Sequence, residues 1–154
     1  MCGIIAFSGD FNHDNIKKSI NLLKHRGPDD TGYSFSENIG LGHTRLSIQD
    51  LSSAGSQPMT DEKNNITIIF NGEIYNVNSL RRELVELGYT FKSKSDTEVI
   101  LYLYAEKKFN LLEKIDGIYS IVIWDRTDNF LFIARDPIGI KPLYFYNKNN
   151  KFMC

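Results

Sequence analysis

The chain is poor in the residues that build disulfide frameworks and metal sites. Its 154 residues include two cysteines, Cys2 and Cys154, at opposite ends, and three histidines. Two such cysteines can form at most one bridge, so they make neither a disulfide framework nor a zinc site. No two of the histidines have metal-ligand spacing. We therefore expect no metal in this domain.

An excess of one charge and long apolar runs are also missing. The formal net charge is −1, which excludes a strongly basic nucleic-acid binder. The densest apolar run, Ile118–Trp124, is strand-sized and far shorter than the roughly 20 residues of a membrane helix. The first residues do not have the pattern of a signal peptide. We expect a soluble, cytoplasmic protein whose partners are neither nucleic acid nor membrane.

Strand-like segments dominate the two ends of a chain whose length suits about one domain. They are recognised as apolar runs or as alternations of apolar and polar residues. The expected strands are Cys2–Phe7, Thr31–Phe35, Gly40–Ile48, Ile66–Phe70, Ile118–Trp124, Phe130–Ala134 and Leu143–Tyr146. A turn is expected at Asn147–Asn150 and a long loop at Leu51–Asn65.

Helical patterns lie in the middle of the chain. Leu80, Leu84 and Leu87 fall on one helix face, and Gly88 is suited to the C-cap. A second helix begins at Ser95, three residues before Glu98, which is the spacing of a capping box. A weaker pattern predicts a helix over 15–24. Strands, then two helices, then strands indicate an α+β fold with mostly antiparallel sheet.

Cys2 directly follows the initiator methionine. Removal of Met1 would leave one residue that carries both a thiol and a free α-amine. An α-amine has an ordinary pKa of roughly 7.7–8.0, so it can take the thiol proton near neutral pH and later protonate a leaving group. The alternative interpretation is that Cys2 is a small apolar residue at the start of a buried strand.

Six ordered motifs give the chain a family resemblance. They are RGPDD at 26–30, HTRLSI at 43–48, NGEIYN at 71–76, SDTE at 95–98, DGIYS at 116–120 and ARDPIGIKPLY at 134–144. Together they resemble the class II glutamine amidotransferase domain, an N-terminal-nucleophile hydrolase. Within that class they are most similar to the glutaminase domain of glutamine-hydrolysing asparagine synthetases. The resemblance implies a four-layer αββα sandwich of two antiparallel sheets.

The resemblance also implies an activity and its catalytic residues. The Cys2 thiolate would attack the side-chain amide of L-glutamine, ammonia would leave, and water would release glutamate from the thioester. The Asn71 side chain and the Gly72 N–H would form the oxyanion hole, a role that suits a side-chain amide beside a glycine. The alternative for Asn71-Gly72 is an ordinary turn.

Three charged residues are the expected substrate contacts. The resemblance assigns Arg45 to the α-carboxylate of glutamine, and a planar guanidinium fork matches a carboxylate. It assigns Asp96, helped by Glu73, to the ammonium group. The alternatives are a solvated arginine, a carboxylate that complements a helix N-terminus, and a solvated loop glutamate.

The same resemblance makes 1–154 a glutamine amidotransferase domain that is incomplete at its C-terminal end. A synthetase domain, in the same or a partner chain, would consume the ammonia, for example to convert aspartate to asparagine. ATP and Mg²⁺ are implied for that absent domain, and no cofactor for this one. A homodimer is a further candidate assembly.

Three other functions stay open at the level of the sequence. The chain could be the glutaminase domain of another class II amidotransferase, one that forms an amino sugar or phosphoribosylamine. It could be a non-catalytic regulatory module that retains the fold. It could also be a structural relic that does not fold alone.

Overall fold

The computed structural model describes residues 1–154 and contains nine strands, three α-helices and three short 3₁₀ helices. In chain order these are β1 (Gly3–Ser8), α1 (His13–Leu22), η1 (Lys24–Arg26), β2 (Asp30–Phe35), β3 (Ile39–Arg45), η2 (Ser53–Gly55), β4 (Met59–Asp61), β5 (Ile66–Ile74), α2 (Val77–Glu86), α3 (Asp96–Lys107), η3 (Lys108–Glu113), β6 (Gly117–Asp125), β7 (Phe130–Arg135), β8 (Tyr146–Lys148) and β9 (Lys151–Met153).

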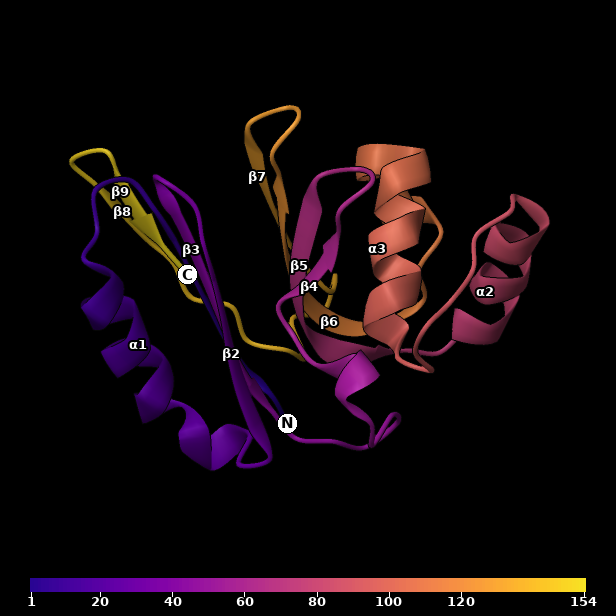
Figure 1. The fold of residues 1–154 in the computed structure, drawn as a ribbon, viewed down its shortest axis with the longest axis horizontal. Helices are drawn as coiled ribbons and strands as arrows, with labels where there is room; N and C mark the ends of the chain where they lie inside the picture. The colour runs from indigo at the N-terminus through magenta and orange to yellow at the C-terminus, as the bar shows by residue number, and fades with distance from the viewer.

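The strands form two antiparallel sheets. The first sheet has the order β2-β3-β1-β9-β8 and the second has the order β4-β5-β6-β7. Helix α1 covers the outer face of the first sheet, while α3, with α2 beyond it, covers the outer face of the second (Figure 1). These layers confirm the expected αββα sandwich. None of the helices has both the length and the apolar content that crossing a membrane requires.

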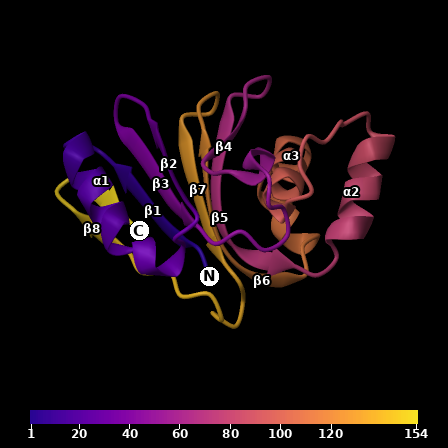
Figure 2. The ribbon, with the colours of Figure 1, turned by 60° about the horizontal axis from the view of Figure 1, so that its bottom comes forward.

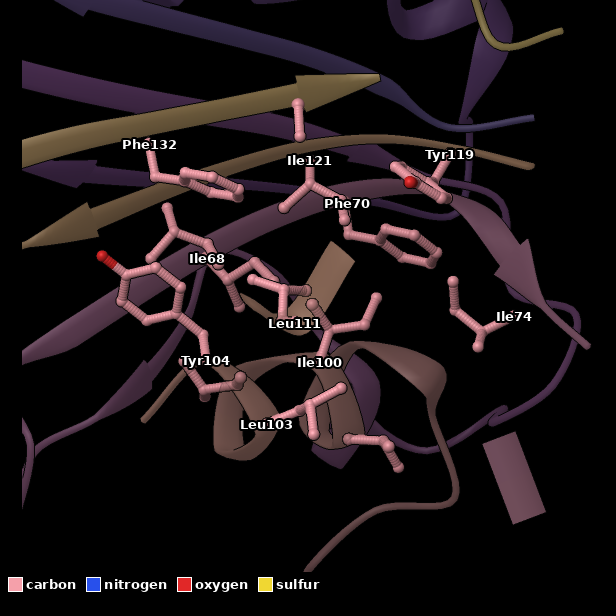
Figure 3. Packing of buried hydrophobic residues seen from close by; sticks show 14 of the residues in the cluster. Ile68, Phe70, Ile74, Ile100, Leu103, Tyr104, Leu111, Tyr119, Ile121 and Phe132 are labelled. Atoms are coloured by element: carbon pink, nitrogen blue, oxygen red, sulfur yellow. The ribbon is translucent and has the colours of Figure 1, made fainter. Parts of the chain in front are cut away.

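The largest apolar core lies between the second sheet and α3. It contains 17 buried residues, among them Ile68 and Phe70 of β5 and Ile100 and Tyr104 of α3 (Figure 3). Successive strand residues point to opposite faces, so the even-numbered residues of β5 form this core. The odd-numbered ones, such as Ile69, face the first sheet. Because both faces of β5 are covered, its first five residues, Ile66–Phe70, are apolar except for Thr67 and do not alternate with polar residues.

The helix termini agree with the predicted signals in part. Gly88 has φ +94° just beyond α2, as expected for a glycine at a helix C-terminus. The Ser95 side chain accepts from the Glu98 N–H, as a capping residue does. The Glu98 carboxylate does not complete the capping box. It accepts instead from the N–H groups of Lys92 and Ser93 and fixes the loop before α3.

Two local predictions are wrong. The segment 143–145 is not a strand, and both Asn147 and Lys148 belong to β8 rather than to the turn. The turn is the pair Asn149 and Asn150, both with positive φ, a conformation that suits a two-residue hairpin and that asparagine tolerates. The expected strand Gly40–Ile48 ends at Arg45, and the expected loop Leu51–Asn65 contains η2 and β4.

Candidate functional site

Cys2 lies immediately before β1, at one end of the space between the two sheets, where the views place the N-terminus (Figure 2). The backbone on each side of the thiol is fixed. Arg26 Nε donates to the Cys2 carbonyl (3.1 Å), and the Gly3 N–H donates to Thr44 Oγ1 (3.1 Å). Arg26, from the first motif, therefore holds the backbone at Cys2. The Leu46 N–H lies 3.5 Å from the Cys2 sulfur, as a weak donor to it.

A cavity of about 180 Å³ opens beside the Cys2 thiol. All six residues expected at the site line it, so the structure brings together the residue before β1 and groups from β3, β5 and α3. They are Cys2, Arg45, Asn71, Gly72, Glu73 and Asp96. Met1 borders the same cavity, with its sulfur 3.2 Å from Lys141 Nζ. Removal of Met1 would therefore enlarge the cavity next to the thiol.

Asn71 and Gly72, the expected oxyanion donors, lie near the end of β5. Across from Gly72 on β6, Tyr119 donates its N–H to the Asp136 carboxylate (3.3 Å) and accepts at its carbonyl from the Asp136 N–H (2.8 Å). Both backbone groups of Tyr119 thus point away from Gly72, which makes the two a non-hydrogen-bonded pair. Gly72 therefore directs its own N–H away from β6, where it can serve an oxyanion together with the Asn71 amide.

Asp96, the first residue of α3, has one carboxylate oxygen that is bonded and one that is free. Oδ2 accepts from the Ile74 N–H (2.8 Å) and from Gln49 Nε2 (3.3 Å), while the buried Oδ1 has no partner. Burial raises the pKa of Asp96, the two hydrogen bonds oppose that rise, and the nearby Glu73 carboxylate adds to it. A buried carboxylate with a free oxygen is a suitable acceptor for an ammonium group.

Arg45 ends β3 and is buried, with its guanidinium held by backbone carbonyls. Nη1 donates to the Ser52 carbonyl (2.8 Å) and Nη2 donates to that of Asp50. Both ion pairs of the chain involve Lys108, so Arg45 forms none, although its charge interacts with the Asp50 carboxylate. A guanidinium that is fixed and forms no ion pair favours binding of a carboxylate. Glu73 reaches the rim of the same cavity but is exposed.

His43 lies two residues before Arg45 on β3 and is also buried. Burial lowers its pKa to about 4, and the Arg45 charge contributes to the same shift. The imidazole is therefore neutral near pH 7. No group of three His, Cys, Asp or Glu side chains is placed to hold a metal ion.

A second cavity, of about 420 Å³, lies on the other side of Cys2 and Asn71. It is mainly apolar and is bordered by the first residues of β1 and by 142–146, where Tyr144 and Phe145 are highly exposed. Cys2 and Asn71 border both cavities. They form the wall between a charged space and an apolar one.

Two polar residues of the site lie outside every motif. Gln49 and Gln57 line the first cavity from segments outside the regular elements, and Lys141, which lies within the motif at 134–144, lines it as well. No periodicity or spacing in the sequence indicates that these residues meet Cys2. Asp136, from the last motif, has a structural role, because its carboxylate accepts from backbone N–H groups, including that of Lys141 (2.9 Å).

Comparison with known proteins gives the same assignment as the geometry. A family model described as "Glutamine amidotransferase domain" matches residues 1–154. The chain belongs to this family. Among curated proteins it is 44% identical to asparagine synthetase (glutamine-hydrolyzing) 1 of Bacillus subtilis (strain 168), covering 98% of this chain and 25% of that protein. It is 37% identical to amidase chry2 of Gibberella zeae, with coverages of 99% and 25%.

The amidotransferase domain thus spans about a quarter of the length of these relatives. Among solved structures, glutamine phosphoribosylpyrophosphate amidotransferase of B. subtilis superposes with a TM-score of 0.83. The two share 19% sequence identity, and the match covers 99% of this chain and 41% of that one. At that identity the likeness shows a shared fold.

Proposed function

We propose that this domain hydrolyses the side-chain amide of L-glutamine to glutamate and ammonia through a thioester at Cys2. The observation that carries the proposal is the set of unused groups around one cavity. The Gly72 N–H points away from its neighbouring strand, Asp96 Oδ1 has no partner, and Arg45 forms no ion pair. Free glutamine offers the matching amide carbonyl, ammonium and carboxylate.

The reaction follows from where these groups lie. The Cys2 sulfur would attack the amide carbon while the oxygen charge develops toward Asn71 and Gly72. Once Met1 is removed, the α-amine of Cys2 would take the thiol proton and pass it to the departing nitrogen. The C–N bond then breaks and ammonia leaves. Water attacks the thioester, breaks the C–S bond and releases glutamate.

The ammonia would supply an ATP-dependent synthetase domain, of the same or a partner chain, that converts aspartate to asparagine. The support is the likeness to relatives that are named glutamine-hydrolyzing asparagine synthetases. ATP and Mg²⁺ would be bound by that synthetase domain. Within this domain the substrate is glutamine, and we expect the reaction to need no cofactor.

Intact-mass measurement of the purified protein tests the proposal, before and after treatment with 6-diazo-5-oxonorleucine, a diazoketone analogue of glutamine. We expect the mass of a chain that lacks Met1 and, after treatment, one adduct that maps to Cys2. Ammonia release from glutamine should disappear in step with adduct formation. An adduct on Cys154, or full glutaminase activity in a protein that retains Met1, would refute the mechanism.

A further inference from the structure

On the edge of β5 beyond the end of β4, three backbone N–H groups donate no hydrogen bond to a neighbouring strand. The ladder between β4 and β5 ends at the Met59–Ile68 pair, and alternate residues after Ile68 point their N–H groups to the same side. The Phe70 N–H donates to Gln57 Oε1 (2.6 Å), and the Ile74 N–H donates to Asp96 Oδ2 (2.8 Å). The Gly72 N–H lies between them.

Gln57 connects this edge to α3. Its amide Nε2 donates to Thr97 Oγ1 (2.9 Å), and Thr97 directly follows Asp96. The Gln57 side chain therefore bonds to the residue before the Asn71-Gly72 pair and to the residue after Asp96. It is buried and borders the cavity that contains Cys2.

The backbone of Gln57 is fixed as well. Its carbonyl lies against Gly32 of β2, where a Cβ would collide with it. The residue thus contacts the first sheet through its backbone and both the second sheet and α3 through its side chain. A buried amide with all these contacts has little freedom to move, so it can hold the distance between the elements that it joins.

We infer that Gln57 is a positioning residue that fixes the distance between the oxyanion donors at 71–72 and the Asp96 carboxylate. By fixing this distance, Gln57 favours glutamine as substrate over the shorter asparagine. This inference rests on the proposed function. Both substrates offer the same end groups, and they differ by one methylene. Discrimination between them therefore depends on how rigidly the two ends of the site are separated.

The test compares three variants of the full chain. Gln57→Leu keeps the approximate shape and removes both side-chain hydrogen bonds, and Thr97→Val removes the bond to α3 alone. The matched control is Thr67→Val, which removes another buried hydroxyl from β5, one that pairs with Thr60 (3.1 Å) away from the cavity. For each protein, kcat and KM are measured for glutamine and for asparagine, together with the melting temperature.

We expect Gln57→Leu to lower kcat/KM for glutamine about 10- to 100-fold, because small misplacements of reacting groups are costly. The preference for glutamine over asparagine should fall with it. Thr97→Val should act mainly on KM, because the oxyanion strand keeps its bond to Gln57, and should also reduce the preference. Thr67→Val should lower the melting temperature and leave the preference unchanged.

An unchanged preference in Thr97→Val, or in a folded Gln57→Leu, would overturn the inference while leaving the glutaminase intact. If Gln57→Leu does not fold, Thr97→Val decides alone. A wild-type protein that neither hydrolyses glutamine nor is labelled at Cys2 would instead overturn the proposed function, and this inference with it.

Discussion

The two cavities that meet at Cys2 and Asn71 differ sharply in charge. The smaller cavity is lined by five charged residues, whereas Arg26 is the one charged residue of the larger cavity. The five are Arg45, Asp50, Glu73, Asp96 and Lys141. A zwitterion that enters the apolar side would lose its hydration without gaining partners, whereas neutral ammonia loses much less. We therefore expect substrate to bind on the charged side and ammonia to leave toward the apolar side.

The largest effect on activity is expected from substitutions of Cys2, one of the two residues that separate the cavities. Cys2→Ser keeps a hydroxyl within reach of the α-amine but loses most of the nucleophilicity of the thiol. We expect glutamine turnover to fall by several orders of magnitude while glutamine still binds. Cys2→Ala should behave in the same way. Turnover is measured by ammonia release and binding by calorimetry.

Cys154 provides the matched control for this prediction. It borders the apolar cavity, and burial raises the pKa of its thiol to about 11. A thiol that stays protonated near neutral pH is a poor nucleophile. Cys154→Ala also retains the backbone hydrogen bonds to Ala6. It should therefore be harmless, and a loss of turnover in Cys154→Ala comparable to that in Cys2→Ser would contradict the assignment.

The next largest effect is expected at the other residue of the wall. Asn71→Ala removes the side-chain donor and leaves the Gly72 N–H in place. By analogy with other single oxyanion donors, kcat should fall about 10²- to 10³-fold, with little change in KM, because the lost contact strengthens only as charge develops. Steady-state kinetics with glutamine checks this. A change confined to KM would place Asn71 among the ground-state contacts instead.

Asp96 tests the charged cavity by itself. Asp96→Asn keeps the shape and removes the charge, so KM for glutamine should rise about 10- to 100-fold, the size of a lost charge-assisted hydrogen bond. In the wild type, burial raises the pKa of Asp96, so the carboxylate becomes neutral at a higher pH than ordinary aspartates do. KM should therefore rise on acidification before other carboxylates titrate, and Asp96→Asn should lack that rise.

Two comparisons sharpen this prediction. Arg45→Lys keeps the charge but loses the fork that contacts the carbonyls of Asp50 and Ser52. It should raise KM and retain the pH dependence of the wild type.

Because a carboxylate with a raised pKa destabilises the folded state at neutral pH, Asp96→Asn should melt at or above the wild-type temperature. A strong loss of stability would show that Asp96 is mainly structural.

The elements with the strongest apolar patterns could be predicted from the sequence. Strands β5 and β6 contain the largely apolar runs Ile66–Phe70 and Ile118–Trp124 because both of their faces are covered there. Two of the three-residue strands, β4 and β8, could not be predicted from such patterns. In β8, Tyr146, Asn147 and Lys148 are all exposed, so its pairing with β9 defines it rather than any burial pattern. The loop 51–65 likewise hides β4, whose side chains are only half-buried.

For the site, the sequence supplies residue types and the fold supplies their geometry. Cys2 can be identified from its position after Met1, and Asn71-Gly72 from its motif after a strand. The direction of the Gly72 N–H depends on where β4 stops and on Tyr119 pairing with Asp136, which no local pattern contains. Gln57 was missed for the same reason, because its partners lie 13 and 40 residues away along the chain.

The smallest effect is expected at the segment 136–142 after β7, which contributes Lys141 to the charged cavity and Pro142 to the apolar one. The buried Asp136 carboxylate accepts from the N–H groups of Ile140 (2.8 Å), Lys141 (2.9 Å) and Tyr119 (3.3 Å). Burial alone would raise the pKa of Asp136, but these backbone hydrogen bonds outweigh it and lower the pKa. The ionised carboxylate therefore stabilises the fold above the ordinary aspartate range.

Asp136→Asn places an amide nitrogen against N–H donors, so at least one of these bonds is lost. We expect a loss of about 1–3 kcal/mol in the free energy of unfolding, and a melting temperature lower by roughly 2–4 °C per kcal/mol. The deficit should be full at pH 7 and shrink as the pH falls through the lowered pKa, where the wild-type carboxylate also becomes neutral. Urea unfolding at pH 7 and at acidic pH measures this deficit.

Asp10→Asn is the control, because it removes the same charge from an exposed loop. Equal unfolding midpoints for the two variants at pH 7 would show that Asp136 does not hold the connection. The glutaminase kcat of Asp136→Asn should fall less than that of Asn71→Ala, because it shifts the partner strand of Gly72 and leaves both oxyanion donors in place.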